Sequence, residues 1–192
     1  MKQVLVINGH PNVNSFNYAL SDAYVQGAVK TDANISRINI SELEFDPNLA
    51  SGDQHNAELE PDLKEAIEKI KKADHLVWAF PVWWYGSPAL MKGFIDRTFL
   101  PGIAFKYVEG KAIPQKLFKG KTARVIMTAD TPKWYDVLFM KRPAIHQFKK
   151  GTLQFCGIDP VKITYIAPVI GSKDSFRKKW LEKVRLLGEK LA

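Results

Sequence analysis

The sequence of 192 residues holds one cysteine, Cys156, and only four histidines. A lone cysteine cannot form an intramolecular disulfide, so the fold is not expected to need an oxidising compartment. We therefore expect a cytoplasmic location. Because Phe155 and Gly157 flank it, Cys156 is predicted to be a small buried apolar side chain rather than a reactive thiol. No cluster of cysteine and histidine has the spacing of metal ligands, and we expect no metal site.

Long apolar segments and the common nucleotide-binding motifs are also missing. The longest apolar runs are a few residues, far short of the roughly 18 that span a bilayer, so neither an integral membrane segment nor a signal peptide is expected. No G-x-G-x-x-G follows the first apolar run, and neither the Walker pattern nor a G-x-S-x-G elbow occurs. These absences argue against a standard Rossmann dinucleotide site, a P-loop and a serine hydrolase of that type.

The net charge of +8 is distributed unevenly, because residues 1–96 carry −5 and residues 97–192 carry +13. A basic half favours an anionic partner. Nucleic acid is not expected, since no nucleic-acid-binding motif is present and many lysines fall in helical segments, where they form a solvated face. A phosphorylated small molecule, or no specific anionic partner, is favoured instead.

Apolar patterning and turn residues predict one α/β domain over residues 1–192, a length typical of a single core. The expected strands are 3–8, 34–40, 75–80, 123–129 and 161–167, and the expected helices are 15–30, 58–73, 88–98, 138–156 and 173–190. Turn-forming residues predict a loop over 46–56. Strands that alternate with helices favour a doubly wound, mostly parallel sheet with helices on both faces.

Ligands of such sheets bind outside the carboxyl ends of the strands, which directs attention to the loops 9–15, 81–88 and 128–136. The first loop leads into a helix whose free N–H groups and positive dipole end suit a phosphate. His10, Ser15 and Asn17 can add donors there. The alternative is that Ser15 and Asn17 only cap the helix.

The second loop, "PVWWYG", places three aromatic side chains after a buried-looking strand. Exposed aromatic rings are costly unless they border a flat ligand, so this loop favours a planar, apolar ring system as ligand. The alternative is that Trp83, Trp84 and Tyr85 pack under neighbouring helices or at a dimer interface.

Three segments carry a resemblance to a known family: "INGHPNVNSFN", "ADHLVWAFPVWWYGSPALMKGFIDRTFLPGIAF" and "LQFCGI". Together they resemble the flavodoxin-like NAD(P)H:quinone oxidoreductases. The resemblance extends to small bacterial relatives, including the ancillary oxidoreductases of potassium-efflux systems and the modulators of drug activity. It covers most of the chain and is weakest across 41–57 and 129–150.

The resemblance implies a flavodoxin-like fold with strand order 2-1-3-4-5, a bound flavin that is FAD or FMN, and NADPH or NADH as reductant. It also implies a quinone or similar electrophilic acceptor and a homodimer. The positions that match the family's flavin-binding residues are His10, Ser15, Phe16, Asn17, Pro81, Val82, Trp83, Trp84, Tyr85, Thr128, Ala129 and Asp130.

These positions fall into three groups in the family. The first group holds the flavin phosphate at the helix start, and the second runs along the edge of the isoalloxazine ring. The third group is usually a Thr-Thr-Gly-Gly-like turn, from which this chain departs, because Thr128 is followed by Ala129, Asp130 and Thr131.

The resemblance also implies catalytic and substrate-binding residues. Tyr135 matches a tyrosine near the reacting face, but the histidine that partners it has no equivalent at matching spacing. His146 lies further along and is assigned no catalytic role. Phe105 and Tyr107 match aromatic residues over the nicotinamide and quinone pocket, with Tyr107 also expected to act in catalysis, and the second subunit commonly completes this pocket.

The implied reaction is a ping-pong transfer, in which NAD(P)H passes a hydride to flavin N5 and leaves before a quinone takes the same site and accepts two electrons. Two alternatives stay open. One is an electron-carrier flavodoxin, which the basic charge disfavours because such carriers dock through acidic surfaces. The other is a flavin-binding regulatory subunit of a potassium-efflux transporter.

Overall fold

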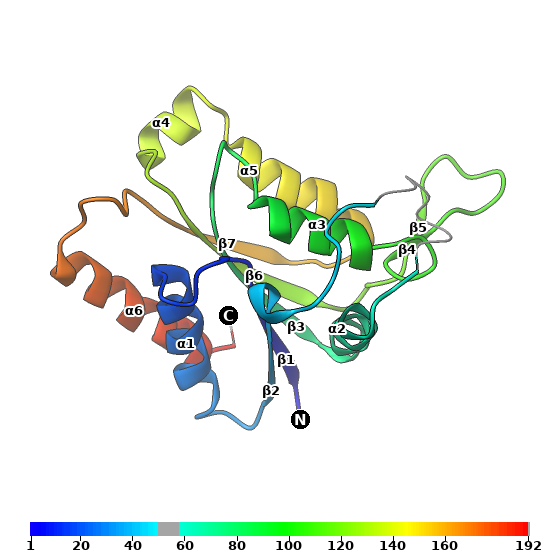
Figure 1. The fold of residues 1–192 in the computed structure, drawn as a ribbon, viewed down its shortest axis with the longest axis horizontal. Helices are drawn as coiled ribbons and strands as arrows, with labels where there is room; N and C mark the ends of the chain where they lie inside the picture. Colours follow the sequence, from blue (N-terminus) through cyan, green and yellow to red (C-terminus); the bar gives the residue numbers. More distant parts are fainter. Residues whose placement is uncertain (50–57, 192) are drawn as a thin grey trace.

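The computed structural model describes residues 1–49 and 58–191 of the chain. A five-stranded parallel sheet forms its centre, in the order β2-β1-β3-β6-β7 (Figure 1). The strands are β1 (Gln3–Asn8), β2 (Asn34–Asn39), β3 (His75–Pro81), β6 (Thr122–Thr128) and β7 (Val161–Ile166). Counted along the main sheet, this is the expected order 2-1-3-4-5, and the predicted flavodoxin-like fold class is confirmed.

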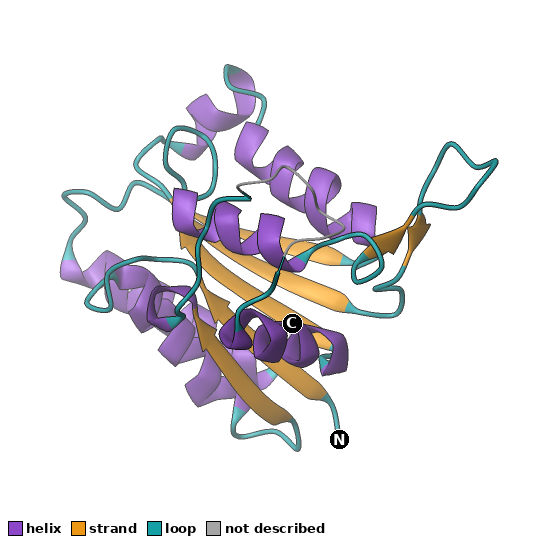
Figure 2. Cartoon of the chain, turned by 45° about the vertical axis from the view of Figure 1, so that its right-hand side comes forward, coloured by secondary structure: helices purple, strands orange, loops and turns teal. Residues whose placement is uncertain are grey.

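Helices cover both faces of the sheet, as Figures 1 and 2 show. One face carries α1 (Phe16–Ala28) and α6 (Asp174–Glu189), and the other carries α2 (Pro61–Lys72), α3 (Ala89–Thr98), α5 (Pro143–Ile145) and η2 (His146–Gln154). Side chains alternate between the faces along each strand. In β1, for example, Val4 and Val6 pack toward α1, whereas Leu5 and Ile7 belong to the larger core on the opposite face.

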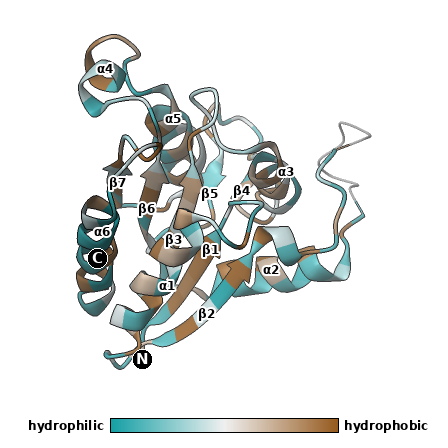
Figure 3. Ribbon diagram, turned by 60° about the vertical axis from the view of Figure 1, so that its left-hand side comes forward, coloured by the Kyte–Doolittle hydropathy of each residue, from teal (hydrophilic) through white to brown (hydrophobic). Residues whose placement is uncertain are grey.

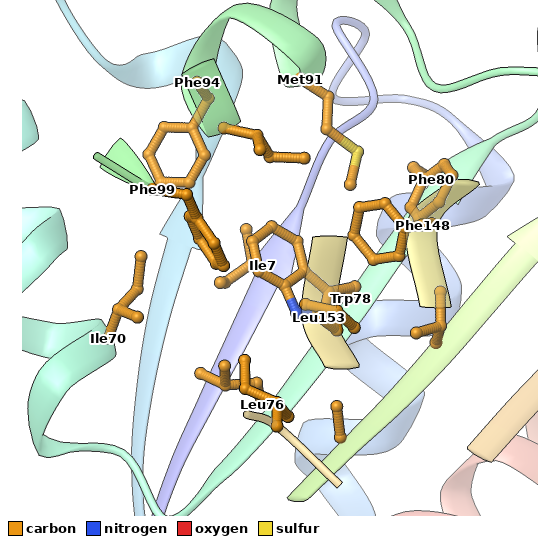
Figure 4. Packing of buried hydrophobic residues seen from close by; sticks show 14 of the residues in the cluster. Ile7, Ile70, Leu76, Trp78, Phe80, Met91, Phe94, Phe99, Phe148 and Leu153 are labelled. Atoms are coloured by element: carbon orange, nitrogen blue, oxygen red, sulfur yellow. The ribbon is translucent and has the colours of Figure 1, made fainter. Parts of the chain in front are cut away.

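The larger core is built around aromatic residues of β3 (Figure 4). The ring centroids of Trp78 and Phe148 lie 5.3 Å apart, and those of Phe80 and Phe148 lie 4.8 Å apart. Trp78 also meets Phe94 of α3 edge to face at 6.5 Å. Such offset contacts add to the gain from burial and fix α3 and η2 against β3. The loop between β3 and α3 is thereby held at both ends.

The smaller core depends on a close crossing of α1 and α6. A Cβ added at Gly27 would overlap the carbonyl oxygen of Arg185, and one added at Gly188 would overlap that of Tyr24. The two backbones therefore touch, and only glycine allows this approach at either position. The crossing fixes the direction of α1 and hence the place of its amino-terminal end at the sheet edge.

Most expected elements are confirmed to within a few residues, but the helix expected over 138–156 is wrong at its start. A separate helix, α4 (Lys133–Leu138), comes first, and Lys141 and Arg142 then take left-handed φ angles of 56° and 57°. These angles break the helix, and Pro143 begins α5 at its first helical position. The chain continues as η2, a π-helix.

Smaller elements were also missed by the patterning. They are a hairpin of β4 (Phe105–Lys106) and β5 (Gln115–Lys116) and a 3-10 turn, η1 (Ile40–Glu42). The loop expected over 46–56 lies partly outside the described residues. Among the helices of the described ranges, none combines the length and the hydropathy that crossing a membrane requires.

The amino end of the sheet contains a buried histidine far from the loops of interest. His75 begins β3, is 3% exposed, and its Nδ1 lies 2.6 Å from Thr122 Oγ1. Burial, reinforced by the positive charges of Lys2, Arg124 and Lys162, lowers the pKa of the imidazole to about 4. The ring is therefore neutral in the folded protein at neutral pH.

This histidine predicts acid sensitivity. In the unfolded chain the imidazole protonates near its ordinary pKa of about 6.5, whereas the folded ring stays neutral down to about 4. Between these values the unfolded state binds a proton that the folded state does not, so the free energy of unfolding falls as the pH is lowered through this window. We expect a loss of roughly 3 kcal/mol, measured by urea unfolding at a series of pH values.

The matched variants are His75→Gln, which removes the titrating ring, and His146→Gln, which removes an exposed imidazole. The first should flatten the pH dependence between about pH 6.5 and 4, and the second should leave it as in the parent. An unchanged slope in His75→Gln would assign the acid sensitivity to other groups.

Candidate active site

The three loops singled out in the sequence meet at one edge of the sheet, because β1, β3 and β6 are parallel neighbours and end together. Backbone hydrogen bonds connect the points where these strands end. The N–H of Gly9 donates to the carbonyl of Ala79 at 2.9 Å, and the N–H of Val82 donates to the carbonyl of Thr128 at 2.7 Å. The exits of the three strands thus form one hydrogen-bonded frame.

The first loop is held by a chain of side-chain-to-backbone bonds. Asn8 Oδ1 accepts from the N–H of His10, His10 Nδ1 accepts from that of Asn12, and Asn12 Oδ1 accepts from that of Asn14. Partial burial lowers the pKa of His10, and with Nδ1 as the acceptor of the Asn12 N–H the ring proton of the neutral form is on Nε2. His10 therefore serves first to shape the loop.

The start of α1 is open to a ligand. Ser15 Oγ accepts from the N–H of Tyr18 at 3.4 Å, which is the expected cap. The N–H groups of Phe16 and Asn17 have no acceptor within the described part of the chain. The first turn carries no acidic residue, and the guanidinium of Arg177 lies 5.8 Å from the centre of the Phe16 ring. This end of α1 is electropositive.

Arg177 was missed by the sequence reasoning. It comes from α6, where its Nε also donates to Ser172 Oγ at 3.0 Å. In the sequence it belongs to the lysine-rich stretch "SFRKKW", and no motif separates it from the solvated residues around it. Only the crossing of α1 and α6 brings it beside Phe16.

A buried hydrogen bond joins the first and third loops. Thr128 Oγ1 donates to Asn17 Oδ1 at 2.8 Å, and the two residues are 4% and 2% exposed. The other atom of the Asn17 amide, Nδ2, is buried and has no hydrogen-bond partner among residues 1–49 and 58–191. A buried donor without an acceptor is costly, and an acceptor atom on a ligand would satisfy it.

The second loop is a tight hairpin with strained residues. The N–H and carbonyl groups of Trp83 and Gly86 pair at 3.0 and 2.9 Å, while Trp84 and Tyr85 between them have φ angles of 49° and 57°. Two left-handed residues make a type I′ turn, for which Asn-Gly is preferred. Bulky residues in this region cost roughly 1–2 kcal/mol each. Strain kept in such a loop points to a functional role.

The aromatic rings of the hairpin do not all face the same way. Trp83 lies edge to face with His10, with ring centroids 5.8 Å apart, so it borders the first loop. Trp84 is fully exposed. The Tyr85 hydroxyl lies 3.5 Å from Thr131 Oγ1 and borders the third loop. Of the three aromatic residues, Trp83 and Tyr85 are the ones that the structure joins to the neighbouring loops.

The third loop uses its residues to hold other segments. Asp130 Oδ1 accepts from the N–H groups of Val169 and Ile170 at 3.2 and 2.7 Å, which fixes the segment after β7. Tyr165 donates from its hydroxyl to the carbonyl of Thr131 at 3.1 Å. Burial, followed by the nearby carboxylate of Asp136, raises the pKa of Tyr165 to about 12, so this hydroxyl stays protonated. Asp130 thus has a structural role that the sequence did not reveal.

Of the predicted catalytic and substrate residues, Tyr135 lies on the helix that follows the third loop, whereas Phe105 and Tyr107 lie away from this edge. Tyr135 lies on α4, 39% exposed and stacked on Phe139 with centroids 5.1 Å apart. Phe105 and Tyr107 lie beyond the far end of α3, a helix about 15 Å long. There the ring centroids of Phe105 and Phe155 lie 5.2 Å apart. Figure 1 shows the β4–β5 hairpin at the opposite side of the molecule from α4.

The remaining candidates add no chemistry to the site. His146 is exposed at the start of η2. Cys156 is 2% exposed, which confirms the predicted buried side chain, and burial raises the pKa of its thiol to about 12. Within residues 1–49 and 58–191, no three acidic, histidine or cysteine side chains are grouped as metal ligands.

The hairpin gives a direct test of stored strain. Trp84→Asn should raise the free energy of unfolding by about 1 kcal/mol, because asparagine tolerates a left-handed backbone and the lost indole is fully exposed. Trp134→Asn, at an exposed position of α4 with helical backbone, is the matched control and should bring no gain. Urea unfolding measures both. A Trp84→Asn protein no more stable than its parent would mean that the turn is unstrained.

The sequence matches the family described as having a flavodoxin-like fold over residues 2–186. An uncharacterized NAD(P)H oxidoreductase of Haemophilus influenzae is 27% identical, across 93% of this chain and 90% of the relative. The NAD(P)H dehydrogenase (quinone) 1 of Cavia porcellus is also 27% identical, across 86% of this chain and 69% of the relative. A crystal structure from Streptococcus mutans superposes with a TM-score of 0.87 at 29% identity, covering 98% and 99% of the two chains. The resemblance to quinone oxidoreductases is confirmed, and the chain belongs to the family with the flavodoxin-like fold.

Proposed function

We propose that the protein is a flavin-dependent NAD(P)H oxidoreductase with a quinone or a similar electrophile as acceptor. The observation that carries this proposal is the frame at the sheet edge, where an open helix start, a strained aromatic hairpin and the Thr128–Asn17 hydrogen bond meet. The named activities of relatives, an NAD(P)H oxidoreductase and an NAD(P)H dehydrogenase (quinone), support it.

The residues at this edge fit a flavin. The phosphate of FMN or FAD needs donors and positive charge, which the N–H groups of Phe16 and Asn17 and the guanidinium of Arg177 supply. The ring needs a flat apolar border, for which Trp83 and Tyr85 are the candidates, and donors along its edge, for which the candidates are the N–H groups of Trp84 and Tyr85, since those of Val82 and Trp83 donate to Thr128 and Gly86. The unpartnered Nδ2 of Asn17 is a further donor for the bound group.

A flavin bound here would accept a hydride from NAD(P)H and return two electrons to the acceptor. The chain has the tasks of binding, orientation and proton supply. Trp83 and Tyr85 border the first and third loops and are placed to orient the ring. The hydroxyl of Tyr135, on α4 beside the third loop, is the candidate proton donor to the reduced acceptor.

The test begins with flavin affinity. Ser15→Asp keeps a good helix cap but places a negative charge at the expected phosphate position, whereas Ser15→Asn keeps the cap without the charge. We expect Ser15→Asp to weaken binding of FMN or FAD by about tenfold or more relative to Ser15→Asn. Fluorescence titration of flavin into the apoprotein measures this. Equal flavin affinities of the two variants would show that the flavin phosphate does not bind at the start of this helix.

Turnover is checked on the same proteins. Flavin absorption in the parent should bleach when NADPH is added without oxygen and should return stoichiometrically with benzoquinone, and Ser15→Asn should behave similarly. A parent protein that stays colourless after incubation with both FMN and FAD would contradict the proposed function.

The proposal includes a homodimer. Phe105 and Tyr107 lie at the far end of α3 from the three loops, so a substrate pocket that uses them needs a second copy of the chain. Tyr107 is 63% exposed and can reach a neighbouring subunit. The groove between α3 and η2, about 300 Å³, lies beside this hairpin and presents Phe105 and Phe155 to it.

Mixed dimers test this arrangement. Ser15→Asp and Tyr107→Ala should each turn over quinone poorly as homodimers. If Tyr107 serves the partner's flavin, a heterodimer of the two variants holds one fully intact site, and activity should return to about half of the parent value per dimer. If Tyr107 serves its own chain, both sites of the heterodimer stay defective and no activity returns. Two affinity tags isolate the heterodimer, and light scattering measures its mass.

A further inference from the structure

Large apolar side chains are exposed along one short helix. On α4, Trp134 is 60% exposed and Leu138 is 68% exposed, and Phe139, just after the helix, is 63% exposed. Trp134 and Tyr135 contact Phe139 and each other. Figure 3 shows α4 standing away from the body of the molecule. We call residues 133–142 the α4 segment.

Other exposed apolar residues lie at the same edge of the sheet. Val13, Trp84 and Ile170 are 53%, 101% and 79% exposed, and they lie in the loops that follow β1, β3 and β7. The bond from Ile170 N–H to Asp130 joins the last of these loops to the loop that leads into α4. Single exposed apolar residues need no explanation, but a group of them marks an interaction surface.

The charge around this surface indicates the partner. The α4 segment contains three basic side chains, Lys133, Lys141 and Arg142, the last of which lies 3.8 Å from the buried carboxylate of Asp136, and the exposed Asp130 precedes the segment. Lysines stand at both ends of the exposed apolar stretch. Tryptophan, leucine and phenylalanine between flanking lysines are typical of segments that lie at a lipid interface. An anionic lipid surface offers hydrocarbon to the apolar side chains and negative charge to the lysines. An apolar protein partner offers only the first.

We propose that the α4 segment docks on the surface of an anionic lipid membrane. Trp134, Leu138 and Phe139 enter the boundary between headgroups and acyl chains, and Lys133 and Lys141 pair with lipid phosphates. The protein lies on the membrane and does not span it.

Vesicle flotation of the full chain tests this inference. We expect the protein to float with vesicles that contain phosphatidylglycerol, and less with vesicles of phosphatidylcholine alone. Binding should fall as salt is raised, because the attraction of lysine to anionic headgroups is screened. Leu138→Glu should lower the vesicle-bound fraction about tenfold, and Lys133→Glu should lower it about fivefold.

Ile113→Glu is the matched control, because Ile113 is 74% exposed and lies between β4 and β5, away from α4. It should float like the parent. Absence of flotation in the parent, or equal flotation of parent and Leu138→Glu, overturns the proposal. Leu138→Glu could instead change the mass measured by light scattering and leave vesicle binding unchanged. That result also overturns the proposal, because the α4 segment is then a contact between copies of the chain. Flotation uses neither flavin nor NAD(P)H, so its outcome is separate from that of the proposed function.

Discussion

The hydrogen bond from Thr128 to Asn17 joins the last residue of β6 to the first turn of α1, across 111 positions of sequence. Both residues are almost completely buried, so loss of either partner would leave the other unsatisfied at a cost of about 1–3 kcal/mol. The carbonyl of Thr128 also accepts the N–H of Val82, where the chain leaves β3. One residue thus fixes the start of α1 and the start of the hairpin relative to the sheet. The electropositive end of α1 and the aromatic hairpin keep their mutual positions because of this junction.

The hairpin can remain strained because the structure beneath it is strongly packed. Two bulky residues, Trp84 and Tyr85, have left-handed backbone, at a cost of roughly 1–2 kcal/mol each. Directly before them, Trp78 and Phe80 are at most 1% exposed, and burial of each such side chain stabilises the fold by about 1.5–3 kcal/mol. Their contacts with Phe148 hold the end of β3, and α3 holds the other end of the loop. The gain from the core therefore balances the local cost, and the turn is kept in a conformation that its own sequence does not favour.

Patterning predicted the sheet well because its signals are local. Short apolar runs followed by turn residues identify buried strands, and the parallel topology then places their loops at one edge. The errors come from interactions that local patterns do not record. Lys141 and Arg142 take left-handed angles without the glycine or asparagine that usually marks such a break, so the helix predicted over 138–156 started too early and α4, which precedes the break, was not predicted. Asp130 and Arg177 take their roles from partners 40 and more positions away, at Ile170 and Phe16. The aromatic loop predicted a ring-binding surface but not which of its rings would be exposed.

The outward position of α4 has a physical cause in its only buried residue. Asp136 is 3% exposed, and burial raises the pKa of its carboxyl group more strongly than Arg142, 3.8 Å away, lowers it. The ion pair and the backbone bond from Arg142 N–H to Asp136 both lie within the α4 segment, and the bond from Tyr165 to Thr131 holds the loop that leads into α4. A helix held by an apolar face would have its large side chains in the core, but here the polar side chain faces inward and Trp134, Leu138 and Phe139 remain in solvent. Rotation of α4 to bury these rings would expose the carboxyl group of Asp136. The exposed apolar surface therefore follows from the inward position of Asp136. Burial of these side chains would stabilise the protein, and this gain requires another molecule that covers them.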